Sequence, residues 1–140
     1  MKQTFLLLML LAASTLNAQH KLTIVVDGVE QTSGTVYAAV YDAENFLKKP
    51  AYRMLVKADK EEVSIVLDSV APGNYAVSLF HDENDNGKLD TGAFGIPTEK
   101  TGFSNNAKGA YGPPKFDDCQ FTVDDDTVIY ITLTSYKMPQ

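Results

Sequence analysis

Oxygen-bearing side chains recur at alternate positions in a short acidic segment near the middle of the chain. Counted from the first aspartate, they occupy positions 1, 3, 5 and 9, and a glycine occupies position 6; the residues are Asp82, Asn84, Asn86, Asp90 and Gly87. Ca²⁺ binds about six to eight oxygens, and glycine permits the sharp turn that lets alternate side chains of one loop point inward. The carbonyl oxygen of Lys88 is the candidate ligand at position 7. The spacing therefore predicts a calcium site, with Ca²⁺ as the cofactor.

The predicted loop lacks one ligand of the EF-hand pattern. Position 12, where an EF-hand has a bidentate glutamate, is Ala93, so another acid or a water molecule would have to complete the site. Glu99 is the nearest glutamate downstream. With two carboxylates among the named ligands, we expect a dissociation constant on the order of 10⁻⁴ to 10⁻³ M. The alternative is a metal-free turn in which the same side chains cap backbone amides.

The histidines leave little room for catalytic chemistry. The chain has two, His20 and His81, so a zinc site of three histidines is excluded. His81 directly precedes the loop and is the candidate base for a small hydrolase that would use the neighbouring acids. Its other role is to bond the loop backbone from the end of a strand. We favour this structural role and expect a non-enzymatic protein without catalytic residues.

A long segment without strand periodicity, residues 82–117, contains the predicted metal loop. Segments of this length in a small domain are uncommon and are usually functional or disordered. Large apolar residues recur through it and predict an ordered loop; they are Phe94, Ile96, Phe103, Tyr111 and Phe116. Phe103 and Tyr111 are candidates for a surface that binds a glycan or a peptide. The alternative is that these two rings anchor the loop itself.

The rest of the chain alternates apolar and polar residues with period two, which is typical of strands with one buried face. Seven such segments occur, at residues 21–27, 34–41, 52–57, 62–67, 74–81, 118–123 and 127–133. Short turns between most of them favour antiparallel hairpins. We therefore predict an all-β fold, an antiparallel seven-stranded immunoglobulin-like sandwich with one long ordered loop.

The alternation also predicts which side chains face the core. These are Leu22, Ile24, Val26, Val36, Ala38, Val40, Val63, Ile65, Leu67, Tyr75, Val77, Leu79, Phe121, Val123, Ile129, Ile131 and Leu133. Cys119 shares the strand parity of Phe121, so we expect it to face inward as a small apolar residue. As the chain has no other cysteine, an intramolecular disulfide is impossible.

A Pro-Gly turn precedes Tyr75. An apolar residue, the turn Pro72-Gly73 and a tyrosine two residues later are the arrangement of a tyrosine corner, in which the hydroxyl bonds an upstream backbone group. The turn resembles the Pro-Gly-x-Tyr turn of transthyretin-like and carboxypeptidase-regulatory-like modules. It indicates a structural role for Tyr75.

Composition and charge describe one small domain. The chain has 140 residues and a net charge of −6. Residues 1–18 read as a secretory signal, because Lys2 is followed by an apolar run and by Leu16-Asn17-Ala18. The mature domain, 19–140, would carry 11 basic and 18 acidic side chains, a net charge of −7, which disfavours nucleic acid and anionic lipid. We expect an exported protein, periplasmic or extracellular, without a membrane span; the partner is left open between a glycan, a peptide and a cell-envelope protein.

Several sequence motifs together resemble one family. They are the run His81 to Asp90, Phe94-Gly95-Ile96-Pro97, Gly102 to Asn106, Gly112 to Phe116, and Pro72 to Val77. The chain resembles the exported bacterial family of domain of unknown function 2141. That resemblance implies a signal-bearing, one-domain β protein and lends no catalytic residues. Three hypotheses follow: a calcium-binding recognition or structural module, a metal-free binding or scaffold domain, and a small hydrolase that uses His81.

Overall fold

Alternating apolar residues form eight β-strands in the described part of the chain, residues 18–137 of the computed structural model. The strands are β1 (His20–Asp27), β2 (Thr35–Tyr41), β3 (Tyr52–Lys57), β4 (Val63–Val70), β5 (Gly73–Asp82), β6 (Thr101–Phe103), β7 (Phe121–Val123) and β8 (Thr127–Thr132). The helical elements are short: η1 (Ala93–Gly95), η2 (Ser104–Asn106) and α1 (Phe116–Cys119). The predicted all-β class is confirmed.

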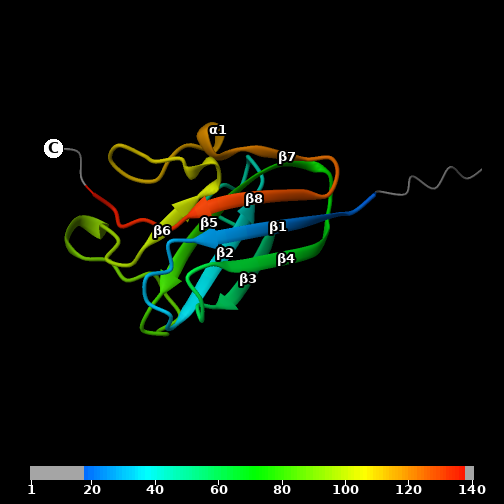
Figure 1. Cartoon of the computed structure of the whole chain (residues 1–140). Coiled ribbons are helices and arrows are strands. Elements are labelled where there is room, and N and C mark those ends of the chain that lie inside the picture. The colour runs from blue at the N-terminus through cyan, green and yellow to red at the C-terminus, as the bar shows by residue number, and fades with distance from the viewer. Residues whose placement is uncertain (1–17, 138–140) are drawn as a thin grey trace, which may run out of the picture.

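The strands form two sheets. One sheet has the order β4-β1-β8, and the other has the order β3-β2-β5-β6, with β7 also paired to β5. Long strand β5 is shared: its first residues, Gly73–Tyr75, pair with β7, and Ser78–Phe80 pair with β6. Figure 1 shows the strands of the first sheet crossing those of the second. Strand β5 therefore contributes to the core and ends at Asp82, where the predicted metal loop begins.

All seven predicted strands are present at least in part, and two features of the predicted topology are wrong. The structure has an additional strand, β6, inside the segment predicted as a loop. Residues Thr101–Phe103 form it by pairing with β5. The sandwich is also not wholly antiparallel, since β1 and β8 pair in parallel. Two parallel strands are not joined by a hairpin, so the turns in the sequence could not predict that β1 and β8 are neighbours.

The predicted core is largely confirmed. Side chains of both sheets form one buried cluster, and it includes every predicted inward residue except Phe121 and Ile129, which are partly buried and pack against it. Cys119 is buried as expected, but it lies in α1 and not in a strand. The predicted strand 118–123 therefore begins only at Phe121, because α1 takes up the preceding residues.

The tyrosine corner is confirmed and secures the start of β5. The hydroxyl of Tyr75 donates to the carbonyl oxygen of Ala71 at 2.6 Å. The Tyr52 hydroxyl accepts from the Ala71 N–H at 3.2 Å, and the rings of Tyr52 and Tyr75 meet edge to face at 6.2 Å. Burial, and then the neighbouring Tyr52, raises the pKa of Tyr75 to about 12. The phenol thus stays protonated as a hydrogen-bond donor.

The predicted signal, residues 1–18, lies outside the described residues apart from Ala18. Within residues 18–137, no helix combines the length and the apolar character that crossing a membrane requires.

Candidate metal centre

The first residue of the predicted calcium loop is anchored at the end of β5. Asp82 pairs with Thr35 of β2 and is fully buried. Its two carboxylate oxygens accept hydrogen bonds from the N–H groups of Asn86 at 3.2 Å and of Gly87 at 2.8 Å. Gly87 has a φ of +78°, a conformation that favours glycine. The turn therefore wraps tightly around one buried carboxylate.

The remaining predicted side-chain ligands close the loop on Asp90. The amide nitrogen of Asn84 donates to Oδ2 of Asp90 at 2.7 Å, and that of Asn86 donates to Oδ1 at 2.6 Å. These bonds, that from Asn86 first, lower the pKa of Asp90. The Lys88 N–H donates to Oδ1 of Asn86 at 3.1 Å. The predicted residues Asp82, Asn84, Asn86, Lys88 and Asp90 thus belong to one hydrogen-bonded loop.

A small hairpin follows Asp90 and returns the chain to it. Thr91 and Pro97 form an antiparallel bridge, and the Thr98 N–H donates to the carbonyl oxygen of Asp90 at 3.0 Å. Ala93, at position 12 of the pattern, lies exposed in the hairpin. The next residue after Thr98 is Glu99. The hairpin therefore carries Ala93 away from the loop and brings a glutamate back to it.

Glu99 is the residue whose position the spacing could not decide. It is 7% exposed, and its Oε2 accepts from the Asp90 N–H at 3.0 Å. Its Oε1 is buried and has no hydrogen-bond partner among the described residues. Burial, and then the charges of Asp90 and Asp82, raises the pKa of Glu99, against the effect of the Asp90 N–H. An acidic group with an unsatisfied oxygen thus lies close enough to two further carboxylates for their charges to act on it. The ligand atoms of the three carboxylates do not all lie within 4.8 Å of one another.

His81 lies at the end of a strand as predicted, but it bonds the backbone ahead of β2 and not the loop that directly follows it. Its side chain is fully buried at the end of β5, and Nε2 lies 2.7 Å from the carbonyl oxygen of Ser33. Because a carbonyl only accepts, Nε2 carries the proton. Nδ1 lies 3.9 Å from the Glu83 carboxylate. The imidazole is therefore enclosed by other protein atoms in this structure.

A family model covers most of the chain. The model of a family described as an uncharacterized protein conserved in bacteria (DUF2141) matches residues 24–130. The chain belongs to this family. The match includes the loop 82–90, Glu99 and the tyrosine corner. No curated protein and no solved structure matches the chain.

The two aromatic candidates of this DUF2141 protein lie in different surroundings. Phe103, on β6, is partly buried and lines a cavity beside the end of β8. Tyr111 is 92% exposed and is not among the residues that line that cavity, although Gly109 and Gly112 are. Phe103 is thus the candidate that faces a hollow.

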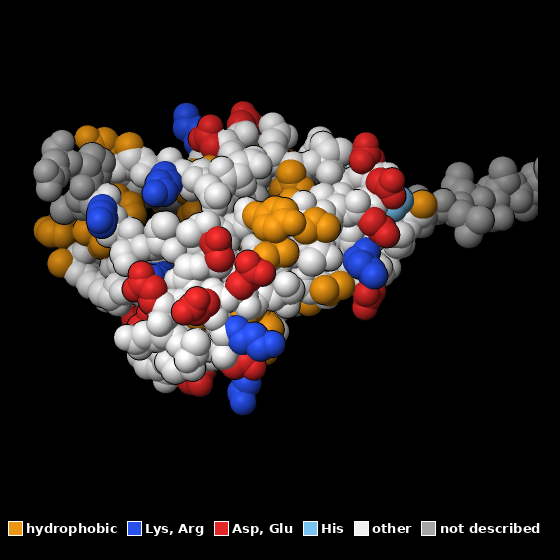
Figure 2. Space-filling model, in the orientation of Figure 1, with side chains coloured by type: hydrophobic (Ala, Val, Ile, Leu, Met, Phe, Trp, Pro, Cys, Tyr) orange, Lys and Arg blue, Asp and Glu red, His pale blue; other side chains and the backbone are white. Residues whose placement is uncertain are grey.

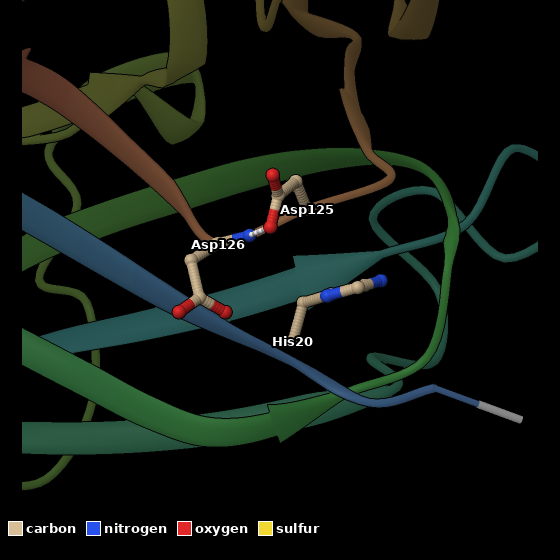
Figure 3. Close-up of side chains that lie close together, drawn as sticks. All are labelled: His20, Asp125 and Asp126. Atoms are coloured by element: carbon tan, nitrogen blue, oxygen red, sulfur yellow. Dashed lines mark hydrogen bonds between the residues drawn. The ribbon is translucent and has the colours of Figure 1, made fainter.

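A second group of possible metal ligands lies far from the loop. His20, Asp125 and Asp126 have ligand atoms within 4.8 Å of one another (Figure 3). The parallel pairing of β1 with β8 brings them together, and nothing local in the sequence indicates it. Asp126 accepts from the Lys21 N–H at 2.8 Å, and Asp125 accepts from the Asp126 N–H at 2.8 Å. These backbone bonds hold the two exposed carboxylates in the turn that precedes β8.

Proposed function

We propose that this DUF2141 protein is an exported, non-enzymatic calcium-binding module with a recognition or structural role. Calcium would be held by side-chain oxygens of Asp82, Asn84, Asn86, Asp90 and Glu99 and by the carbonyl of Lys88. The finer fold assignment, an immunoglobulin-like or transthyretin-like sandwich, belongs to the same proposal, and the tyrosine corner supports it.

The observation that carries the proposal is the unpartnered oxygen of Glu99. A buried carboxylate oxygen without a hydrogen bond is costly, and buried charges are paired or coordinate metals. Burial, and then repulsion by the carboxylates of Asp90 and Asp82, raises the pKa of Glu99. A divalent cation would satisfy the oxygen and reverse the repulsion. Glu99 would also supply the acidic ligand that Ala93 cannot.

Glu99 changes the expected affinity. With Glu99, the proposed site has three carboxylates around one divalent cation, whereas the loop alone would supply two. Because calcium affinity rises with the number of charged ligands, we expect a dissociation constant on the order of 10⁻⁴ M, the tighter end of the range for extracellular modules. Such a site would be filled at millimolar external calcium.

A metal-free scaffold is the second candidate, and one observation favours it. Asn84 and Asn86 already donate to both oxygens of Asp90, so the loop holds itself together by side-chain bonds. The two candidates differ in what happens to Glu99: the scaffold leaves its Oε1 unsatisfied, whereas calcium would bind it.

Thermal unfolding of residues 19–140, which contain all eight strands, separates them. We expect the melting temperature to rise with the logarithm of free calcium above the dissociation constant, and magnesium at the same concentration to have little effect. Glu99→Gln should abolish the shift. The matched control is Asp85→Asn, which removes one charge from the same loop at a residue whose Oδ1 accepts from Thr35 Oγ1 at 2.9 Å; it should keep the shift. No shift of the wild-type protein at 10 mM calcium would overturn the calcium proposal and favour the scaffold.

A further inference from the structure

A cavity of about 690 Å³ lies beside β6. Strand β5, which leads into the predicted calcium loop, does not line it. It is bounded by β6, by the segment 132–137 that ends β8 and follows it, and by the loop 106–114. The volume is within the range of small-molecule binding sites. No residue of the predicted calcium loop lines it. The cavity is therefore a separate feature of the surface.

The cavity is basic in an acidic protein. Lys100, Lys108 and Lys137 line it, and the one carboxylate among its lining residues is Glu30. Lys100 is mostly buried, and its Nζ pairs with Glu30 at 2.7 Å and with the Gly28 carbonyl oxygen at 3.3 Å. Within residues 18–137, no carboxylate lies within 4.0 Å of the ammonium group of Lys108 or Lys137. In Figure 2, basic side chains lie at the end of the molecule where the C-terminal segment emerges.

The walls of the cavity are rich in hydroxyl groups and are held in place by close backbone packing. The hydroxyl-bearing residues are Thr101, Thr132, Thr134, Ser135 and Tyr136. A Cβ on Gly102 would lie 2.8 Å from the Ile131 side chain, so β6 packs directly on β8. A Cβ on Gly109 would collide with the carbonyl oxygen of Gly112, so the loop that carries Lys108 is folded back on itself. Close packing therefore holds the backbone of the cavity at β6 and at Gly109.

We propose that this cavity binds a sugar-sized organic anion, a molecule with a carboxylate or phosphate group on a hydroxyl-bearing body. The lysines supply the positive charge, the hydroxyls suit a polyol, and Phe103 offers an apolar ring for its carbon face. None of the lining residues is a proposed calcium ligand, although Lys100 directly follows Glu99 in the chain. Sugar acids and sugar phosphates share this chemistry.

Titrations followed by amide NMR of residues 19–140 test the proposal. The probes are digalacturonate, which bears carboxylates, glucose 6-phosphate, and maltose as a neutral sugar of disaccharide size. We expect one or both anions to shift the amide signals of residues 100–109 and 132–137, and maltose to shift none. Raising the salt concentration from 50 to 500 mM should weaken binding, because screening acts on charge pairs. The anion that binds more tightly identifies the acidic group.

Matched double variants supply the control. The double variant Lys108→Gln with Lys137→Gln removes two exposed charges from the cavity. It should weaken binding of the anion at least tenfold. Lys57→Gln with Lys60→Gln removes two lysines that do not line it and should leave binding unchanged. The proposal is overturned if neither anion binds, if maltose binds as well as the anions, or if the two double variants lose affinity equally.

Discussion

Oε2 of Glu99 accepts the backbone N–H of Asp90 at 3.0 Å, although the residues are nine positions apart. The short hairpin between them makes this contact possible, and it leaves the second oxygen of Glu99 buried without a hydrogen-bond partner among the described residues. A pattern counted at fixed positions ends at Ala93 and misses this glutamate. The contact therefore changes the candidate site from two carboxylates to three.

Glu99→Gln should have opposite effects with and without calcium. In chelator, the amide removes a buried charge near Asp90 and Asp82, so we expect the variant to be more stable than wild type by about 1 kcal/mol, a rise of a few degrees in melting temperature. In 5 mM calcium, wild type should be the more stable. Differential scanning calorimetry under both conditions measures this reversal; a variant that melts below wild type in chelator would contradict it.

Two glycines with the same backbone conformation should respond differently to alanine. Gly34 has a φ of +75°, and a Cβ there would collide with the Asp82 carbonyl oxygen; Gly87 has a φ of +78° and open space. Gly87→Ala should cost about 1 kcal/mol of strain, and Gly34→Ala roughly 3 kcal/mol because the collision adds to the strain. Urea unfolding measures both. Equal losses would mean that the contact between Gly34 and Asp82 is unimportant.

Tyr75→Phe should destabilise the domain by about 1 kcal/mol, the net contribution of a hydrogen bond such as that to Ala71. The loss should depend on pH. The pKa of Tyr75 is raised to about 12 from the ordinary 10.0, so the unfolded chain loses the proton first and wild-type stability falls as the pH rises from 10 to 12. The variant should show a shallower fall in urea unfolding over that range. Tyr130→Phe, at a 69% exposed residue, is the control and should match wild type.

Cys119 should be unreactive in the folded protein. It is fully buried, and burial followed by the charge of Asp118 raises the pKa of its thiol to about 11. Since the thiolate is the reactive form, a thiol reagent at pH 8 should label it only as fast as the chain opens. Labelling in urea should be complete within the mixing time of the assay. Rapid stoichiometric labelling without denaturant would contradict the buried position.

Export should leave a chain that begins at Gln19. Cleavage after Ala18 follows from the charged start, the apolar run and the small residue before the cut. Mass spectrometry of the protein purified from the periplasm or the medium of an expressing bacterium would measure the mature N-terminus. Recovery of the intact chain in the cytoplasm alone would contradict the prediction.

The period-two alternation of apolar and polar residues by itself determined most of this fold. It predicted seven of the strand segments and nearly all of the core, because each strand buries one face and side chains alternate across it. Residues Pro72 to Tyr75 predicted the tyrosine corner, and the spacing from Asp82 to Asp90 predicted the loop. All of these signals are local, within about ten residues of chain.

Only the tertiary structure decided the contacts between distant segments. The parallel pair β1–β8, the short strand β6 and the group around His20 depend on partners far along the chain, so no local pattern records them. The same is true of the basic cavity, whose lysines and hydroxyls come from three separate segments. The place of Glu99 depends on a hairpin whose length the alternation does not encode. Local periodicity specifies which face of a strand is buried; it does not specify which strand lies beside it, since that depends on how the whole chain packs.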